Sequence, residues 1–167
     1  AYKGRVLLGA NNTRVDGFLL TGGQFRGNGG AIYCRGAEME ISNNLFTANT
    51  TLAPLPWNPK FIHEKAHDGG AVYGEEGASL KVRNNVFWRN HTENGRGAAL
   101  AFHGNCEGEV RQNLFLDNQA GTNDGHRSSD GGAVSIFNWC DVDVVQNLFF
   151  RNTARSKNDE GALFYAF

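Results

Sequence analysis

The chain has 167 residues, of which 40% are hydrophobic and 20% charged, and its formal net charge is −1. This composition excludes a disordered tract, and no apolar run approaches the roughly 18 residues that a membrane-spanning helix needs. The near-neutral charge gives no electrostatic basis for binding nucleic acid. The 22 glycines and 12 phenylalanines indicate repeated turns around a stacked core. We treat residues 1–167 as a single domain.

The two ends of the sequence read like internal segments. AYKGRVLLGANN at 1–12 lacks the charged and apolar regions of a signal peptide, and EGALFYAF at 160–167 opens another repeat. We therefore expect a fragment of a longer chain, in which a missing signal is no evidence against export.

A two-part repeat organises the chain. Its first part is a Gly-Ala element: GGAIYC at 29–34, GGAVYG at 69–74, GAALAF at 97–102 and GGAVSI at 131–136. Its second part is an Asn-Phe element: NNLFTAN at 43–49, NNVFWRN at 84–90, QNLFLDN at 112–118 and QNLFFRN at 146–152. Successive Asn-Phe elements are 41, 28 and 34 residues apart. Within each repeat, by contrast, the second residue of the Asn-Phe element always follows the third residue of the Gly-Ala element, an Ala, by 13 or 14 residues. One half of the repeat is thus fixed, and the other half accepts insertions.

The fixed half has the periodicity of a strand. In ASLKVRNN at 78–85, Leu80 and Val82 alternate with Lys81 and Arg83, a period of two rather than the 3.6 of a helix. We expect an all-β coil of short parallel strands, with each coil about 4.8 Å above the last.

Equivalent residues of successive coils should form ladders. The expected inner ladders are Met39, Leu80 and Val142 (with Gly108 as the odd member), Ile41, Val82, Val110 and Val144, and Phe46, Phe87, Phe115 and Phe149. The expected outer ladder is Glu40, Lys81, Glu109 and Asp143, and the expected corner ladder is Asn44, Asn85, Asn113 and Asn147. Asn suits such a corner because its amide can hydrogen-bond along the stack and because it tolerates left-handed backbone.

The alternation of GGA[I/V] with FxxN resembles the repeats of the chlamydial polymorphic outer-membrane protein family and, more broadly, the right-handed parallel β-helix (pectin-lyase-like) superfamily. VLLGANNTRVDGFLLTGG at 6–23 is similar to the early coils of that superfamily. The resemblance implies a right-handed parallel β-helix solenoid of about five to six coils, with loop insertions at one corner. It does not choose a function, because the superfamily includes polysaccharide lyases, hydrolases and epimerases as well as non-catalytic adhesins.

Two insertions, at 50–68 and 119–130, leave the same corner of the coil. The residues just before each Gly-Ala corner should also stack; they are Asn28, Asp68, Arg96, Asp130 and Glu160. In an enzyme, Asp68, Arg96 and Asp130 with Lys65 would be the catalytic set, binding Ca²⁺ or a uronate and removing an α-proton. The alternative is a charge ladder whose members satisfy one another. We predict no resident cofactor, and no metal site, because the histidines lack metal-ligand spacing.

Cys106 and Cys140 each follow the Ala of their Gly-Ala element by seven residues, so they should lie on adjacent coils within reach of a disulfide. A reduced, buried cysteine stack is the equal alternative. Cys34 has no aligned partner.

One set of apolar residues has no place in the core. Strict alternation buries only one of the two apolar residues that follow each Asn corner, and the next position holds Trp88, Leu116 and Phe150. Either these three side chains form an exposed interaction stripe, or the 50–68 insertion covers them with Leu52, Leu55, Trp57 and Phe61.

The sequence therefore favours a non-catalytic extracellular, cell-surface or periplasmic β-helix, an adhesin-like or scaffold subunit with a protein partner or host complex. The alternative is a polysaccharide-active enzyme or a carbohydrate-binding β-helix that uses Ca²⁺. An open cleft around Asp68, Arg96 and Asp130 would favour the enzyme, and an exposed stripe at Trp88 would favour the interaction module.

Overall fold

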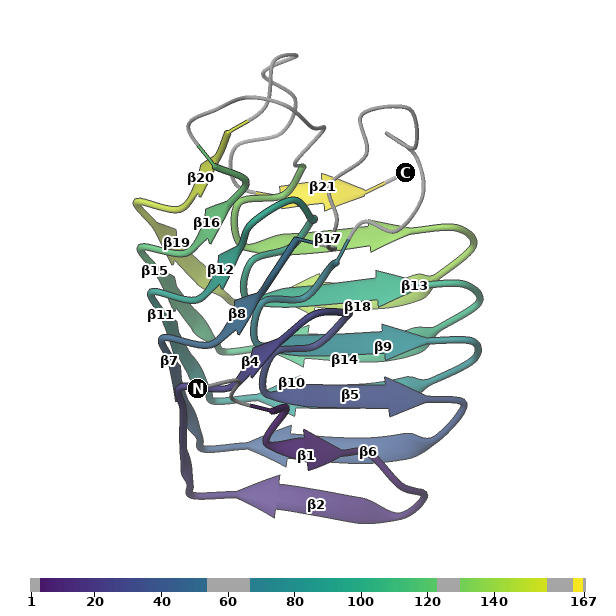
Figure 1. Cartoon of the computed structure of the whole chain (residues 1–167). Coiled ribbons are helices and arrows are strands. Elements are labelled where there is room, and N and C mark those ends of the chain that lie inside the picture. The colour runs from purple at the N-terminus through teal and green to yellow at the C-terminus, as the bar shows by residue number, and fades with distance from the viewer. Residues whose placement is uncertain (1–3, 54–66, 123–129, 156–163, 167) are drawn as a thin grey trace.

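A computed structural model describes residues 4–53, 67–122 and 130–155 and the backbone of 164–166. In this part of the chain, 21 strands form four parallel sheets, which are the sides of a solenoid of stacked coils (Figure 1). The all-β, parallel β-helix fold expected from the sequence is thereby confirmed.

The four sheets are named A to D in the order in which the chain visits them. Sheet A contains β1 (Leu7–Leu8), β5 (Ile32–Arg35), β9 (Val72–Glu75), β13 (Leu100–His103), β17 (Val134–Phe137) and β21 (Phe164–Ala166). Sheet B contains β2 (Thr13–Asp16), β6 (Glu38–Ser42), β10 (Ser79–Arg83), β14 (Glu107–Arg111) and β18 (Asp141–Val145). Sheet C contains β3 (Leu19–Thr21), β7 (Leu45–Thr47), β11 (Val86–Trp88), β15 (Leu114–Leu116) and β19 (Leu148–Phe150). Sheet D contains β4 (Gln24–Phe25), β8 (Thr50–Thr51), β12 (His91–Thr92), β16 (Gln119–Ala120) and β20 (Thr153–Ala154).

Each coil is one passage through the four sheets, so β1–β4 form the first coil and β17–β20 the fifth, while β21 adds a sixth strand to sheet A. Within each sheet, every strand pairs in parallel with its equivalents in the adjacent coils. Both predicted insertions fall between sheets D and A, after β8 and after β16, so they do share a corner. Most of the two insertions lies outside the described residues.

The core is filled by the predicted inner ladders. Phe46, Phe87 and Phe115 are fully buried, and they stack with one another and with Phe149 at centroid separations of 4.7, 5.0 and 4.8 Å. The rings are parallel to within 7°, because each ring inherits its direction from a strand that is translated by one coil.

The odd member of the inner ladder, Gly108, is explained by the opposite sheet. A Cβ at Gly108 would lie 2.9 Å from the ring of Phe102 on β13, so the large side chain of sheet A fills the space left by the glycine of sheet B. In the third coil the sizes are reversed, because a Cβ at Gly74 would lie 2.9 Å from the Leu80 side chain. The interior volume is therefore kept constant by pairs across the core.

Left-handed backbone recurs in register at the two corners that flank sheet C. At the corner between sheets B and C it is adopted by the first residue of each Asn or Gln pair, with φ near 56° at Asn43, Asn84, Gln112 and Gln146. At the corner between sheets C and D it is adopted by Ala48, Arg89, Asp117 and Arg151, with φ of 52° or 53°. The residue that follows each of these is an inward-facing asparagine.

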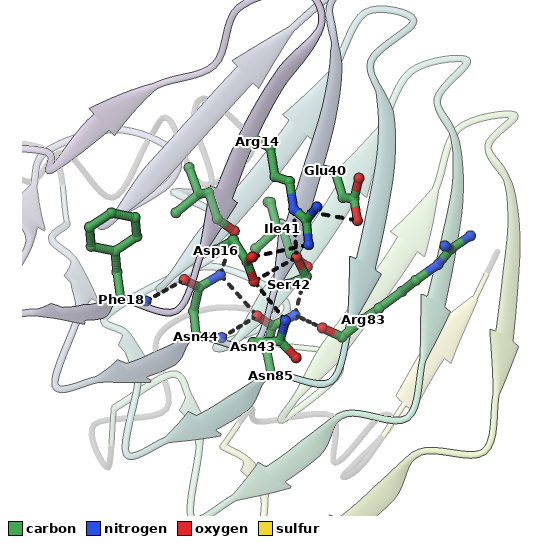
Figure 2. A network of polar contacts seen from close by, with 11 residues as sticks. Arg14, Asp16, Phe18, Glu40, Ile41, Ser42, Asn43, Asn44, Arg83 and Asn85 are labelled. Atoms are coloured by element: carbon green, nitrogen blue, oxygen red, sulfur yellow. Dashed lines mark hydrogen bonds and ion pairs between the residues drawn. The ribbon is translucent and has the colours of Figure 1, made fainter.

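The predicted asparagine ladder is present at the first of these corners. The Oδ1 atom of Asn85 accepts the backbone N–H and the side-chain amide of Asn44, at 2.9 and 3.1 Å. Asn113 and Asn147 repeat this arrangement in the fourth and fifth coils. At the N-terminal end of the ladder the Phe18 N–H donates to Asn44 Oδ1 (Figure 2). Each ladder member thus satisfies backbone groups at a corner where sheet hydrogen bonding is interrupted.

A second asparagine ladder lies at the next corner and was not predicted. It consists of Asn49, Asn90, Asn118 and Asn152. Asn90 has no exposed surface; its amide donates to Phe46 O and Asn118 Oδ1, both at 3.0 Å, and its Oδ1 accepts from Asn49. The signal was the last Asn of each Asn-Phe element.

Replacing Asn90 by Ala should lower the free energy of unfolding by about 2–5 kcal/mol, because it strands the Phe46 carbonyl and the Asn49 N–H in the interior. The matched control is Arg89→Ala, since Ala48 already holds the same φ one coil below, and its effect should stay within about 0.5 kcal/mol. Urea unfolding followed by circular dichroism measures both values. Equal losses in the two variants would contradict the role of the ladder.

The pairing of Phe102 with Gly108 can be tested by a double-mutant cycle. Gly108→Val should destabilise strongly, because its side chain would enter the space of the Phe102 ring and the Leu80 carbonyl. Adding Phe102→Ile reproduces the Ile136 and Val142 combination of the fifth coil and should recover about 1–3 kcal/mol. Strictly additive losses in thermal unfolding would show that the two positions do not share one space.

Candidate functional site

The outer face of sheet C carries two apolar ladders. The first consists of Leu19, Leu45, Val86, Leu114 and Leu148, and the second of Thr21, Thr47, Trp88, Leu116 and Phe150. Eight of these ten side chains are apolar. They point outward because the position between them on each strand, Leu20 or a Phe of the inner ladder, points inward.

This face is open to solvent. Trp88 is 37% exposed and Phe150 53% exposed, while Leu116 between them is half-buried. The structure thus brings together the three residues predicted as an interaction stripe, and it adds the leucine and valine ladder beside them. Of the residues proposed to cover the stripe, Leu52 is buried, and Leu55, Trp57 and Phe61 lie outside the described part of the chain.

Charged side chains border the second ladder along one edge. The Arg89 guanidinium lies 4.6 Å from the centroid of the Trp88 ring, and that of Arg151 lies 4.9 Å from the Phe150 ring. Arg151 Nε also donates to Asp117 Oδ1 at 2.7 Å, which lowers the pKa of the Asp117 carboxyl below its usual range. The aromatic side chains therefore have fixed neighbours, which limits the rotamer entropy that a partner would have to remove.

The alternative catalytic residues form a closed ladder at the corner before sheet A. Arg96 N–H donates to Asp68 Oδ1 at 2.7 Å, Asp68 N–H donates to Asn28 Oδ1 at 2.9 Å, and Arg96 Nε donates to Asp130 Oδ2 at 3.1 Å. Asp68 is 4% exposed and Asp130 2% exposed. The predicted stacking is therefore real for four positions; the fifth, Glu160, and the proposed base Lys65 lie outside the described residues.

The pKa of Asp68 is raised to about 6, mainly by burial and in smaller part by the Asp130 carboxylate, against the hydrogen bond and the charge of Arg96. Such a pKa would suit a general base near neutral pH. A base must also reach a proton of its substrate, however, and Asp68 is enclosed with one oxygen held by the backbone of the next coil. The geometry is that of a structural ladder that links successive coils.

The outer face of sheet B is charged and largely self-paired. Arg14 lies 3.0 Å from Asp16 and 3.8 Å from Glu40, and Ser42 and Asn43 donate to Asp16 (Figure 2). Higher on the same face is a shallow depression of about 290 Å³, lined by Ser79, Lys81, Glu107, Gly108, Glu109, Asp141 and Asp143. Glu109 is paired with Arg83 and Arg111, and Lys81 with Glu38. The other three carboxylates, Glu107, Asp141 and Asp143, would repel an acidic polysaccharide.

Within residues 4–53, 67–122 and 130–155, no group of three or more His, Cys, Asp or Glu side chains is placed to hold a metal ion. No helix long and apolar enough to cross a membrane occurs among the described residues.

The cysteine alignment holds: Cys106 and Cys140 directly precede the paired residues Glu107 and Asp141 of β14 and β18. Both are free thiols, as is the buried Cys34.

The ladder at Asp68 makes a prediction about pH. Because its folded pKa of about 6 lies above the ordinary 3.8, stability is greatest below the lower value and is lost as the pH rises through the higher one. Asp68→Asn keeps the oxygen that accepts from Arg96 but never ionises. The advantage of this variant over the wild type in free energy of unfolding should therefore grow by about 2 kcal/mol between pH 4 and pH 7.

Asp117→Asn is the control, because the pKa of Asp117 is lowered and its contribution to stability is lost as the pH falls. The comparison is made by urea unfolding at both pH values. Parallel pH curves for Asp68→Asn and the wild type would contradict the assignment.

Comparison with known proteins agrees with the geometry. A family model described as a right-handed β-helix region matches residues 6–165. No curated protein and no solved structure matches the chain significantly. The chain therefore belongs to the right-handed β-helix family.

Proposed function

We propose that this β-helix is a non-catalytic interaction module that binds a protein partner through the outer face of sheet C. The observation that carries the proposal is the pair of apolar ladders that runs along this face. Contiguous exposed apolar surface rimmed by charge is typical of protein interfaces, and the exposed aromatic residues Trp88 and Phe150 are of the type that dominates binding energy.

The shape of the face favours a protein over a small ligand. Five coils spaced by about 4.8 Å make a stripe roughly 20 Å long, and each strand of sheet C contributes only three residues. Such a narrow, flat and rigid surface fits an extended partner with apolar side chains at its centre. A partner with an acidic group opposite Arg89 would complement the charged edge, whereas the Arg151 guanidinium is already paired with Asp117.

We place the module outside the cell, on a cell surface or in the periplasm, as an adhesin-like or scaffold subunit. This part of the proposal is supported by the resemblance of the GGA[I/V] and FxxN repeats to the chlamydial polymorphic outer-membrane protein family. The enclosed position of Asp68 and Asp130 and the acidic depression on sheet B favour a module without polysaccharide chemistry.

The binding face can be tested by site-specific photo-crosslinking in an extract of the source cells. A crosslinking residue at Trp88 or Leu116 should give the same protein adduct, whereas one at Asp143, on the outer face of sheet B, should not. With the identified partner purified, Leu116→Glu should weaken binding at least about tenfold, because it places a carboxylate in the apolar stripe. Lys81→Gln, on the outer face of sheet B, changes the net charge by the same amount and is the matched control. Calorimetric titration measures both variants. Equal weakening by the two variants would refute the assignment of the face.

The absence of catalysis is tested separately. Neutral and acidic polysaccharides, with and without Ca²⁺, should yield no new reducing or unsaturated ends. Turnover that Asp68→Asn abolishes and Leu116→Glu leaves intact would overturn the proposal in favour of an enzyme.

A further inference from the structure

We propose that Cys106 and Cys140 form a disulfide under oxidising conditions, which fastens the fourth coil (β13–β16) to the fifth (β17–β20). The two residues occupy equivalent positions at the corner between sheets A and B, and in the structure both are free thiols. The site is distinct from the outer face of sheet C and does not depend on the function proposed for that face.

The backbone brings the two sulfurs together. Asp141 N–H donates to the Cys106 carbonyl at 2.8 Å, so the two cysteines are direct neighbours across one coil spacing. That spacing of about 4.8 Å falls within the Cα separations that disulfides accept. The Cys140 sulfur already lies 3.3 Å from the backbone nitrogen of Cys106. Formation of the bond therefore needs side-chain rotation rather than movement of the coils.

Only one of the two thiols is accessible. Cys106 is 1% exposed, whereas Cys140 is partly exposed and follows Trp139, which is 89% exposed. Asn138 and Trp139 both have positive φ, so Cys140 directly follows a turn whose central residue Trp139 faces solvent. An oxidant should therefore meet Cys140 first, and Cys106 should complete the reaction.

With oxidised glutathione as the oxidant, the steps balance. The Cys140 thiolate attacks one glutathione sulfur, which forms a mixed disulfide and releases one glutathione thiolate. The Cys106 thiolate then attacks the Cys140 sulfur, the protein disulfide forms, and the second glutathione leaves as a thiolate. The two thiol protons end on the two reduced glutathiones, and the two protein thiols are oxidised.

The second step should be the slower one near neutral pH. Burial raises the pKa of the Cys106 thiol, and it still does so once Cys140 carries glutathione, so little of the attacking thiolate is present. The rate of ring closure should rise with pH.

The third cysteine is an internal control. Cys34 is fully buried, its thiol donates to the Ala37 carbonyl at 3.4 Å, and its neighbour in the next coil is Gly74. It has no sulfur beside it on that coil, so it should remain reduced.

The experiment uses the full chain, reduced and then incubated with mixtures of reduced and oxidised glutathione. The number of free thiols should fall from three to one, with the mass loss of two hydrogens and a linked peptide that contains Cys106 and Cys140. The melting temperature should rise by about 5–10 °C, because the bond closes a loop of some 35 residues, and a reductant should reverse the rise.

Cys140→Ala should abolish the link and still fold, because Ala78 occupies the same position in the third coil. Cys34→Ser should form the link as the wild type does. A glutathione adduct that persists on Cys140 without ring closure, or a link that involves Cys34, would overturn the proposal.

Discussion

The rest of the structure depends on one interaction, the hydrogen bond from the backbone N–H of one coil to the asparagine Oδ1 of the next. At a corner the strands end and their ladder of backbone bonds is interrupted, so these amides would otherwise be unpaired in the interior. Each asparagine also donates to a carbonyl of the preceding coil, as Asn85 does to Ile41 and Asn118 does to Phe87. One side chain thereby ties three coils together. A shift of register by one residue would break every such bond and would also turn each strand inside out. The two ladders on either side of sheet C therefore fix that sheet more firmly than its three-residue strands could alone.

Because corners B–C and C–D are fixed in this way, the long insertions are confined to the corner between sheets D and A, whereas the connection between sheets A and B varies only from two to four residues. The two long insertions leave from that corner, and the short third-coil connection crosses it. The carboxylates of Asp68 and Asp130 lie at the same corner. Like the asparagines, they link one coil to another by accepting hydrogen bonds, but they are acidic groups. Asn28 accepts the Asp68 N–H just as Asp68 accepts the Arg96 N–H. The ion pair between Arg96 and Asp130 offsets part of the free-energy cost of burying these charged groups. The cost that is not offset appears as the raised pKa of Asp68.

The sequence predicted whatever follows from translation by one coil. The phenylalanine stack, the ladder at Asn85, the stacking of Asp68 with Arg96 and the outward position of Trp88 all need only the alignment of repeats. It did not predict features that depend on the opposite side of the coil. Gly108 is tolerated because the Phe102 ring of sheet A fills the space beside it. Aligning the repeats at position 108 compares residues of sheet B only, so it cannot reveal a contact with sheet A. The enclosure of Asp68 depends likewise on three-dimensional surroundings rather than on repeat position. The second ladder, at Asn90, was within reach, since the FxxN spacing recurs without change.

The same geometry explains how the outer face of sheet C can expose so many apolar side chains. Within a ladder each outward side chain lies against its neighbours one coil above and below, so Leu45, Val86 and Leu114 are only half-exposed. Leu19 and Leu148, in the first and last strands of sheet C, are each 61% exposed. Stacking thus lowers the cost of the face in water without removing it. A partner would gain mainly by covering the aromatic side chains and the strip between the two ladders, on a backbone already held by asparagines on both sides. Little conformational entropy would be lost in the module itself, which is the physical reason that a rigid β-helix suits an interaction surface.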